Sequence, residues 1–329
     1  MSPRDDVMSW LLDSDPALRW QVERDLVGVP EAVWQATRAR VPREGMGAAL
    51  LARQDADGQW AGGAFFPADF TEEQRADGQP WTATTWSLKQ LREWGVAASV
   101  LDGTAEKLRT HARWEYDDLP YWDGEVDCCI NGYTLAAGAW LGVDVSGIAR
   151  WFVEHRQPDG GWNCEWVEGS TRSSFPSTLN ALEGVLAYER AGLGFPELTA
   201  ARHGAEQYLL ERRVLYGLRS GEPVVPYVHH LAYPFRHVYS ALHAADYFRA
   251  SALFDGVAPD PRLADAIASI RSKRGDDGRW VQEHRHPGAV WFDVDVPEGE
   301  ASPWLTFLSL RVLEWWDAAS ALAPRGAGA

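Results

Sequence analysis

Cysteine is scarce in this 329-residue chain, and long apolar runs are missing. Its three cysteines, Cys128, Cys129 and Cys164, are too few and odd in number, so they form no disulfide framework and fit a reducing compartment. No stretch reaches the roughly 18 consecutive apolar residues that cross a bilayer. The first ten residues, MSPRDDVMSW, do not resemble a secretory signal. We therefore expect a cytoplasmic protein without an integral membrane segment.

Basic residues are also in short supply. The chain has 31 Lys and Arg against 47 Asp and Glu, a formal net charge of −16 at pH 7. Nucleic acids and anionic membranes bind clustered positive charge, so we expect neither as a partner, and a phosphate-bearing substrate would need a local basic pocket. The patterns Gly-x-x-x-x-Gly-Lys and Gly-x-Gly-x-x-Gly do not occur, and we expect no nucleotide cofactor.

Aromatic residues, in contrast, are plentiful. Eighteen Trp and eleven Phe are spread along the whole chain, and 46% of the residues are apolar. Aromatic side chains bury large areas, so the chain can form a sizeable core. Because no stretch has the composition of a linker, we predict a single domain over residues 1–322, followed by a disordered tail over 323–329.

A short turn recurs along the chain. It reads QDADGQW at 54–60, QPDGGW at 157–162 and DDGRW at 276–280. Each copy follows an amphipathic segment and precedes a more apolar one, such as 304–320. Tyr-Trp-Asp-Gly at 121–124 resembles a degenerate fourth copy, before the apolar run 129–140. A helix that is apolar on every side is buried, whereas one with a single apolar stripe faces solvent on its other side. Alternating outer and inner helices are therefore expected.

The expected inner helices are spaced about 45 to 66 residues apart, with starts near residues 80, 129, 174, 236 and 302, and a first helix covers 15–26. Ser-Pro at 302–303 and Ser-Phe-Pro at 174–176 are typical helix starts. Repeated helix pairs of this kind stack into two layers. We predict an all-α fold, a single (α/α)6 toroid of six inner and five to six outer helices around a central cavity.

The repeated turn carries a family resemblance. Gln followed by Asp-Gly-x-Trp before a buried helix resembles the repeat of squalene and hopene cyclases, and protein prenyltransferase β subunits have related Gly-Gly-Phe turns at the same place. The chain is about half as long as a two-domain triterpene cyclase and resembles one toroid. The resemblance implies a terpene cyclase- or prenyltransferase-like enzyme that acts on an apolar, isoprenoid-derived small molecule in an aromatic cavity.

The same resemblance implies a zinc site. Prenyltransferase β subunits place Asp-x-Cys at a helix start as two zinc ligands and a later His as the third, and Asp127, Cys129 and His237 match these residue types. His237 lies two inner helices after Cys129 rather than one, so Cys164 could replace Asp127 as a ligand. Carboxylate, thiolate and imidazole with one open position are typical of catalytic Zn²⁺. Alternatively, these are small buried thiols and a hydrogen-bonded histidine.

Two acidic segments are candidates for a general acid. Class II terpene cyclases use an Asp-x-Asp-Asp motif, which this chain lacks; its nearest matches contain Asp117 with Asp118 and Asp293 with Asp295. Clustered carboxylates can share a proton and so donate it to a substrate. These aspartates could equally be solvated loop and cap residues.

Large aromatic residues gather near the expected inner-helix starts and the loops before them. As the substrate-binding set we predict Trp81, Trp122, Tyr133, Trp166, Phe175, Tyr239, Trp291 and Trp304. Ligand pockets are commonly lined by such side chains, whose faces also stabilise cations. The alternative function is a toroid that binds a lipid or a protein without catalysis.

Overall fold

A computed structural model describes residues 3–322, so the tail predicted over 323–329 lies outside the described residues. This part of the chain forms thirteen α-helices with short 3₁₀ and π turns, and no strand occurs within it. The predicted all-α class is thereby confirmed. None of these helices is both long and apolar enough to cross a membrane.

Six helices occupy the positions expected of the inner layer. They are α2 (Pro16–Val22), α5 (Thr84–Glu93), α7 (Cys128–Leu141), α9 (Phe175–Arg190), α11 (Ala241–Asp255) and α13 (Pro303–Leu322). Along α5, α7 and α9 nearly every residue of the first turns is buried. Helix α7 is apolar on all sides, whereas α5 also buries polar side chains such as Lys89 and Gln90.

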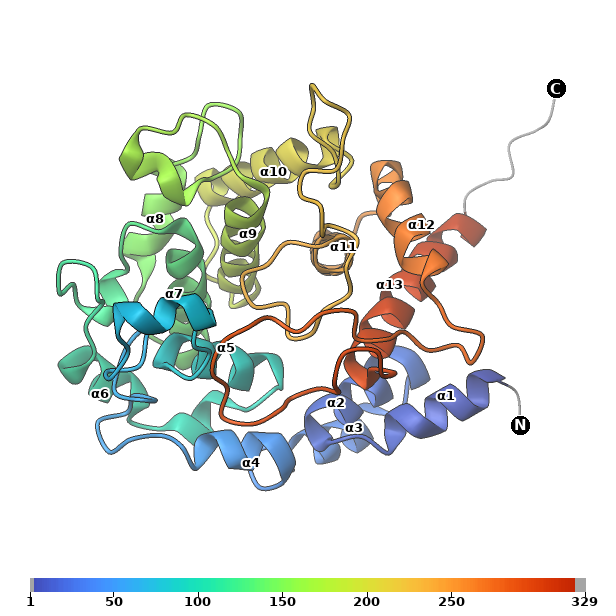
Figure 1. The fold of residues 1–329 in the computed structure, drawn as a ribbon, viewed down its shortest axis with the longest axis horizontal. Helices are drawn as coiled ribbons and strands as arrows, with labels where there is room; N and C mark the ends of the chain where they lie inside the picture. Colours follow the sequence, from blue (N-terminus) through green and yellow to red (C-terminus); the bar gives the residue numbers. More distant parts are fainter. Residues whose placement is uncertain (1–2, 323–329) are drawn as a thin grey trace.

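These six helices contact one another in chain order. Helix α5 packs on α7, α7 on α9, α9 on α11 and α11 on α13. Helix α13 then packs on α1 (Pro3–Leu12) and on the π turn η1 (Glu23–Val27) that continues α2. Between α2 and the end of α5, the Trp20 indole donates a hydrogen bond to the Trp94 carbonyl at 2.9 Å. The first and last of the six helices therefore meet (Figure 1).

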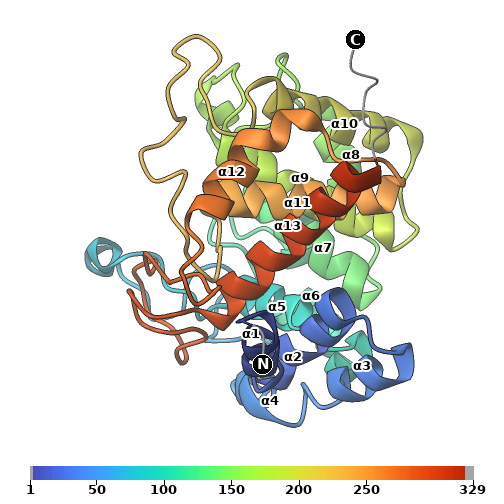
Figure 2. The ribbon, with the colours of Figure 1, turned by 90° about the vertical axis from the view of Figure 1, so that its right-hand side faces the viewer.

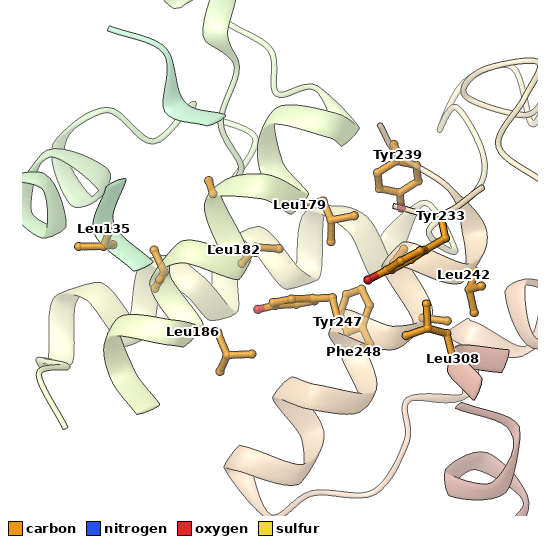
Figure 3. Packing of buried hydrophobic residues seen from close by; sticks show 14 of the residues in the cluster. Leu135, Leu179, Leu182, Leu186, Tyr233, Tyr239, Leu242, Tyr247, Phe248 and Leu308 are labelled. Carbon is orange, nitrogen blue, oxygen red and sulfur yellow. The ribbon is translucent and has the colours of Figure 1, made fainter. Parts of the chain in front are cut away.

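The remaining helices lie outside these six or cover their ends. They are α3 (Glu31–Arg38), α4 (Gly45–Leu51), α6 (Thr104–His111), α8 (Ser146–Glu154), α10 (Pro196–Glu211) and α12 (Ala264–Ser272). One apolar core cluster runs from Val7 to Leu313 and so includes residues from nearly the whole chain. Figure 3 shows part of it, where leucines of α9 face Tyr247 and Phe248 of α11 beside Leu308 of α13.

The three copies of the repeated turn have the same hydrogen bonds. Their tryptophans, Trp60, Trp162 and Trp280, are fully buried. Each indole donates to a carbonyl ten residues earlier, at 2.9, 3.0 and 2.7 Å. Each tryptophan amide donates to a threonine hydroxyl in the first turn of the next helix, at 3.1, 3.1 and 3.0 Å. The turn therefore fastens the end of one helix to the start of the next.

Two of the six helices begin later than the sequence indicates. Helix α5 starts at Thr84 rather than near 80, and α11 starts at Ala241 rather than near 236. Arg236 has a φ of 56°, which a helix cannot contain. Ser240 instead caps α11, since its hydroxyl accepts a hydrogen bond from the His243 amide. The chain just before α11 is therefore not helical, and it crosses the middle of the molecule as an irregular connection.

Three long connections gather at one side of the molecule. They precede α5, α11 and α13 and cover residues 61–83, 217–240 and 281–302. Figure 1 shows the last two crossing in front of the helices, and Figure 2 shows all three on the same side. This side, which we call the loop end, contains the N-termini of α5, α11 and α13.

Candidate functional site

The three cysteines of the chain lie together although two segments supply them. Cys128 and Cys129 open α7, and Cys164 opens the 3₁₀ turn η5 (Cys164–Glu168). The Cys164 sulfur lies 3.4 Å from that of Cys128 and 3.3 Å from that of Cys129. The Ser177 hydroxyl, on the first turn of α9, donates to the Cys164 sulfur at 3.4 Å. We call Cys128, Cys129 and Cys164 the thiol cluster.

The thiols differ in their tendency to ionise. Burial raises the pKa of Cys128 well above its ordinary value. Hydrogen bonds from Cys128 and Cys129 lower the pKa of Cys164, and the Ser177 hydroxyl adds to this effect. Burial, together with the charge of Cys164, raises the pKa of Asp127 to about 7. The cluster therefore combines a favoured thiolate with a carboxyl group that takes up protons near neutral pH.

The imidazole of His237 lies outside the thiol cluster. The three sulfurs are within 4.8 Å of one another, and this group includes neither Asp127 nor His237. The His237 ring lies 5.5 Å from that of Trp81, measured between centroids. Its backbone carbonyl accepts a 3.0 Å hydrogen bond from the Asn180 amide, which also donates to the Cys129 sulfur at 3.7 Å. Of the four predicted ligands, the structure brings together Cys129 and Cys164, and the charge of Cys164 contributes to the raised pKa of the Asp127 carboxyl.

Cys128 is the ligand candidate that the sequence reasoning left out. Cys128 is fully buried. Its sulfur and the Cys129 sulfur lie at nearly the same distance from the Cys164 sulfur, 3.4 and 3.3 Å. Three thiolates around a zinc ion would lie about 3.8 Å apart, since Zn–S bonds are about 2.3 Å long. The observed separations of 3.3 and 3.4 Å are close to this geometry, so the donor set fits zinc.

The four predicted acidic residues have different surroundings. Asp117 and Asp118 are exposed and have φ values of 52° and 53° in a loop. Asp293 is exposed and pairs with Arg285. Asp295 is largely enclosed: the Ser302 hydroxyl donates to its Oδ2 at 2.5 Å, and its Oδ1 is buried without a hydrogen-bond partner.

Burial raises the pKa of Asp295 to about 6. The space beside it is a small void of about 20 Å³, whose walls include Tyr233, Arg236 and Phe292. The Arg236 guanidinium is itself buried and lies 4.9 Å from the Trp81 ring. Among the predicted acids, Asp295 thus has the enclosed setting of a general acid.

A larger cavity, of about 430 Å³, lies among the six inner helices. Each helix contributes at least one side chain to this central cavity: Gln21, Glu93, Trp140, Glu183, Tyr247 and Trp304, in chain order. Residues from the last turns of α5, α7 and α9 line it, so it lies toward the end of the molecule opposite the loop end. Tyr233 and Phe235, from the connection before α11, line it on the other side. The sequence predicted a central cavity but placed its chemistry at the helix N-termini, at the other end of the molecule.

A buried ionic network borders the central cavity. Lys89 is buried, pairs with Glu93, and lies 3.5 Å from Glu183. The His243 ring lies between two acceptors, with Nε2 2.7 Å from Glu183 and Nδ1 3.0 Å from the Val238 carbonyl. Although burial opposes it, the charges of Lys89 and His243 lower the pKa of Glu183 below its ordinary range. The network therefore holds Glu183 as a carboxylate.

The predicted aromatic residues do not share one pocket. Trp304 lines the central cavity, stacked on Tyr233 with centroids 4.5 Å apart. Trp81 and Tyr133 form a separate small cluster with Trp86. Tyr239 packs edge-on against Phe175 and lines a pocket of about 340 Å³ near the loop end. The indoles of Trp122, Trp166 and Trp291 donate to backbone carbonyls of Ala105, Val126 and Thr82.

The chain was compared with protein-family models, with curated proteins and with solved structures. None of the three comparisons finds a match. The thiol cluster, the central cavity and Asp295 are consequently the features from which a function can be inferred.

Proposed function

We propose that this chain is an (α/α)6 toroid that acts as a terpene cyclase- or prenyltransferase-like enzyme on an apolar, isoprenoid-sized molecule. In this proposal α2, α5, α7, α9, α11 and α13 form the inner layer of the ring. The contacts between successive inner helices and the identical fastening of the three tryptophan turns support this architecture.

The central cavity carries the functional proposal. Small-molecule sites are mostly apolar clefts of about 300–1,000 Å³ with a few placed polar groups, and this cavity has a volume of about 430 Å³. Its walls include the aromatic side chains Trp140, Tyr233, Phe235, Tyr247 and Trp304. Aromatic faces suit both an apolar chain and a developing carbocation.

Asp295 is the residue that we assign to proton transfer. Its pKa of about 6 keeps a fraction of the carboxyl protonated near neutral pH, as a general acid requires. Tyr233 lines both the small void beside Asp295 and the central cavity. One phenol ring therefore separates the acid from the space assigned to the substrate.

Intrinsic fluorescence tests the binding step, because Trp140 and Trp304 line the cavity. Farnesol and geranylgeraniol should change the emission in a saturable way. Ala187→Phe, which fills the cavity from α9, should weaken binding about tenfold or more, since it takes up part of the space for the ligand. The matched variant Ala200→Phe, on the exposed face of α10, should bind as the wild type does. If no isoprenoid changes the emission, or if both variants bind equally, the cavity is not the substrate site.

We also propose that the thiol cluster binds zinc. The close approach of all three thiols of the chain supports this, because thiolates are preferred zinc ligands. Cys128, Cys129 and Cys164 would hold the ion, with Asp127 beside it. A bound zinc ion would supply Lewis-acid chemistry, and Ser177 and Asn180 would orient the sulfurs.

A further inference from the structure

The three carboxylates that line the central cavity are already paired with cations. Glu93 pairs with Lys89, and Glu183 lies 3.5 Å from the same ammonium group. The Asp246 carboxylate binds Arg311 through two hydrogen bonds, at 2.7 and 2.5 Å. Glu93 and Glu183 share the Lys89 ammonium, and the charge of Arg92 also acts on Glu183, so each of the three acids has a cation beside it.

Two arginines in the cavity wall make no direct ion pair with a described side chain, although the charge of Arg92 acts on Glu183 and that of Asp246 acts on Arg190. Arg92 comes from the last turn of α5, and Arg190 from the last turn of α9. No ion pair joins either guanidinium to a described acid, and Arg190 donates only to the backbone carbonyl of Ala250. Arg190 is exposed and Arg92 is half-buried, so both guanidinium groups can be reached by a ligand that enters the cavity.

The neighbouring wall also carries more positive than negative charge. Arg24, Arg249 and Arg311 surround Asp25, at 2.5, 3.9 and 3.5 Å, and the only other acid in this group is Asp246. The Arg249 Nε is buried without a hydrogen-bond partner. Three guanidinium groups thus share two carboxylates, beside Arg92 and Arg190. This side of the cavity is therefore positively charged, although the net charge of the chain is −16.

We propose that the occupant of the central cavity carries an anionic group, a carboxylate or a phosphate, which Arg92 and Arg190 bind. Its apolar body lies against Trp304 and Leu308, which α13 contributes to the same cavity. Guanidinium groups bind both anions through paired, charge-assisted hydrogen bonds. This inference rests on the proposed function, since it names the class of molecule that the cavity accepts.

Three ligands with the same hydrocarbon chain but different head groups distinguish the contribution of the charge to binding from that of the apolar contacts. Farnesol, farnesoic acid and farnesyl monophosphate are titrated calorimetrically at pH 7.5 into the full chain. We expect at least one anion to bind about tenfold more tightly than the alcohol, because a hydrogen bond to a charged group contributes more than a neutral one. The relative affinities of the acid and the phosphate then identify the anionic group.

Variants of the two arginines test their role. Arg190→Gln and Arg92→Gln should each weaken anion binding about tenfold while farnesol binding changes less than about twofold. Arg190→Lys should retain part of the preference, because it keeps the charge and loses the planar donor pair. Arg150→Gln, the same change on the exposed outer helix α8, should alter neither affinity. Circular dichroism of each variant verifies that the helices are intact.

The outcomes distinguish this inference from the function on which it rests. If farnesol binds and neither anion binds more tightly, or if the arginine variants weaken alcohol and anion equally, the anion site is wrong and the apolar cavity stands. Arg92 and Arg190 would then stabilise the C-termini of α5 and α9 through the carbonyl groups there. If no ligand binds at all, the proposed function is wrong and the inference is wrong with it.

Discussion

The backbone amide of Trp162 donates a 3.1 Å hydrogen bond to the side-chain hydroxyl of Thr178, sixteen residues later. The same hydroxyl donates back to the Trp162 carbonyl at 3.1 Å. Both residues are fully buried, so water cannot replace either bond. This reciprocal pair connects the turn after α8 to the first turn of α9.

We predict that Thr178→Val destabilises the protein by about 1–3 kcal/mol, because the buried Trp162 amide loses its acceptor while the shape of the side chain is kept. The free energy of unfolding in urea measures the change. Thr110→Val removes an exposed hydroxyl from α6 and should have little effect. Equal stabilities of the two variants would show that the turn is not fastened in this way.

Zinc analysis tests the thiol cluster. Protein purified with zinc and without chelators should contain about one zinc per chain, and Cys129→Ser and Cys164→Ser should each lose it, because two thiolates hold zinc less tightly than three. Inductively coupled plasma mass spectrometry of each folded variant measures the stoichiometry.

His237→Asn distinguishes two possible ligand sets. The imidazole lies outside the thiol cluster, so we expect this variant to retain its zinc. Loss of zinc from the His237 variant, with retention in the Cys164 variant, would favour the ligand set that the family resemblance implies.

The raised pKa of Asp295 predicts a defined pH dependence. In the folded protein this carboxyl keeps its proton up to a pH of about 6, whereas it ionises near its ordinary value of 3.8 when unfolded. The folded state then binds more protons between these values, so stability falls as the pH rises through this window, by about 1.4 kcal/mol per unit of pKa difference at most. Asp295→Asn should flatten the fall in a urea series from pH 4 to pH 7.

In metal-free protein, the remaining slope in Asp295→Asn should come partly from Asp127, whose pKa is raised to about 7. The double variant with Asp127→Asn should therefore be flatter still. A wild-type protein that gains stability steadily from pH 4 to pH 7 would contradict both assignments.

Lys89 supports the buried network beside the cavity. Lys89→Met should destabilise the protein by about 3–5 kcal/mol, because it leaves the Glu183 and Glu93 carboxylates without their ammonium partner. Lys107→Met, on the exposed face of α6, provides the control. Adding Glu183→Gln to Lys89→Met should restore part of the stability, since it removes one unpaired charge. Thermal and urea unfolding of the four proteins measures these differences.

Local chemistry in the sequence determined much of the helical framework. Ser174 and Pro176 indicated the start of α9, where the Ser174 hydroxyl accepts a hydrogen bond from the Ser177 amide. The run from Cys129 to Trp140 is apolar on all sides and forms the buried helix α7. The glycine of each tryptophan turn has a positive φ, between 82° and 109°, which glycine adopts without strain. Such signals act over a few residues and can be read from the chain alone.

The site, in contrast, was decided by the tertiary structure. Nothing local to Cys164 indicates that it contacts Cys128, because the loop between α8 and α9 sets that distance. The sequence predicted His237 beside the cysteines. In the structure Arg236 has a non-helical backbone, and the His237 imidazole packs near the Trp81 ring instead. The central cavity likewise exists only where the last turns of α5, α7 and α9 meet α11 and α13. Capping and periodicity fix where helices begin and which faces are buried, whereas distances between segments far apart in the chain depend on how all the helices pack together.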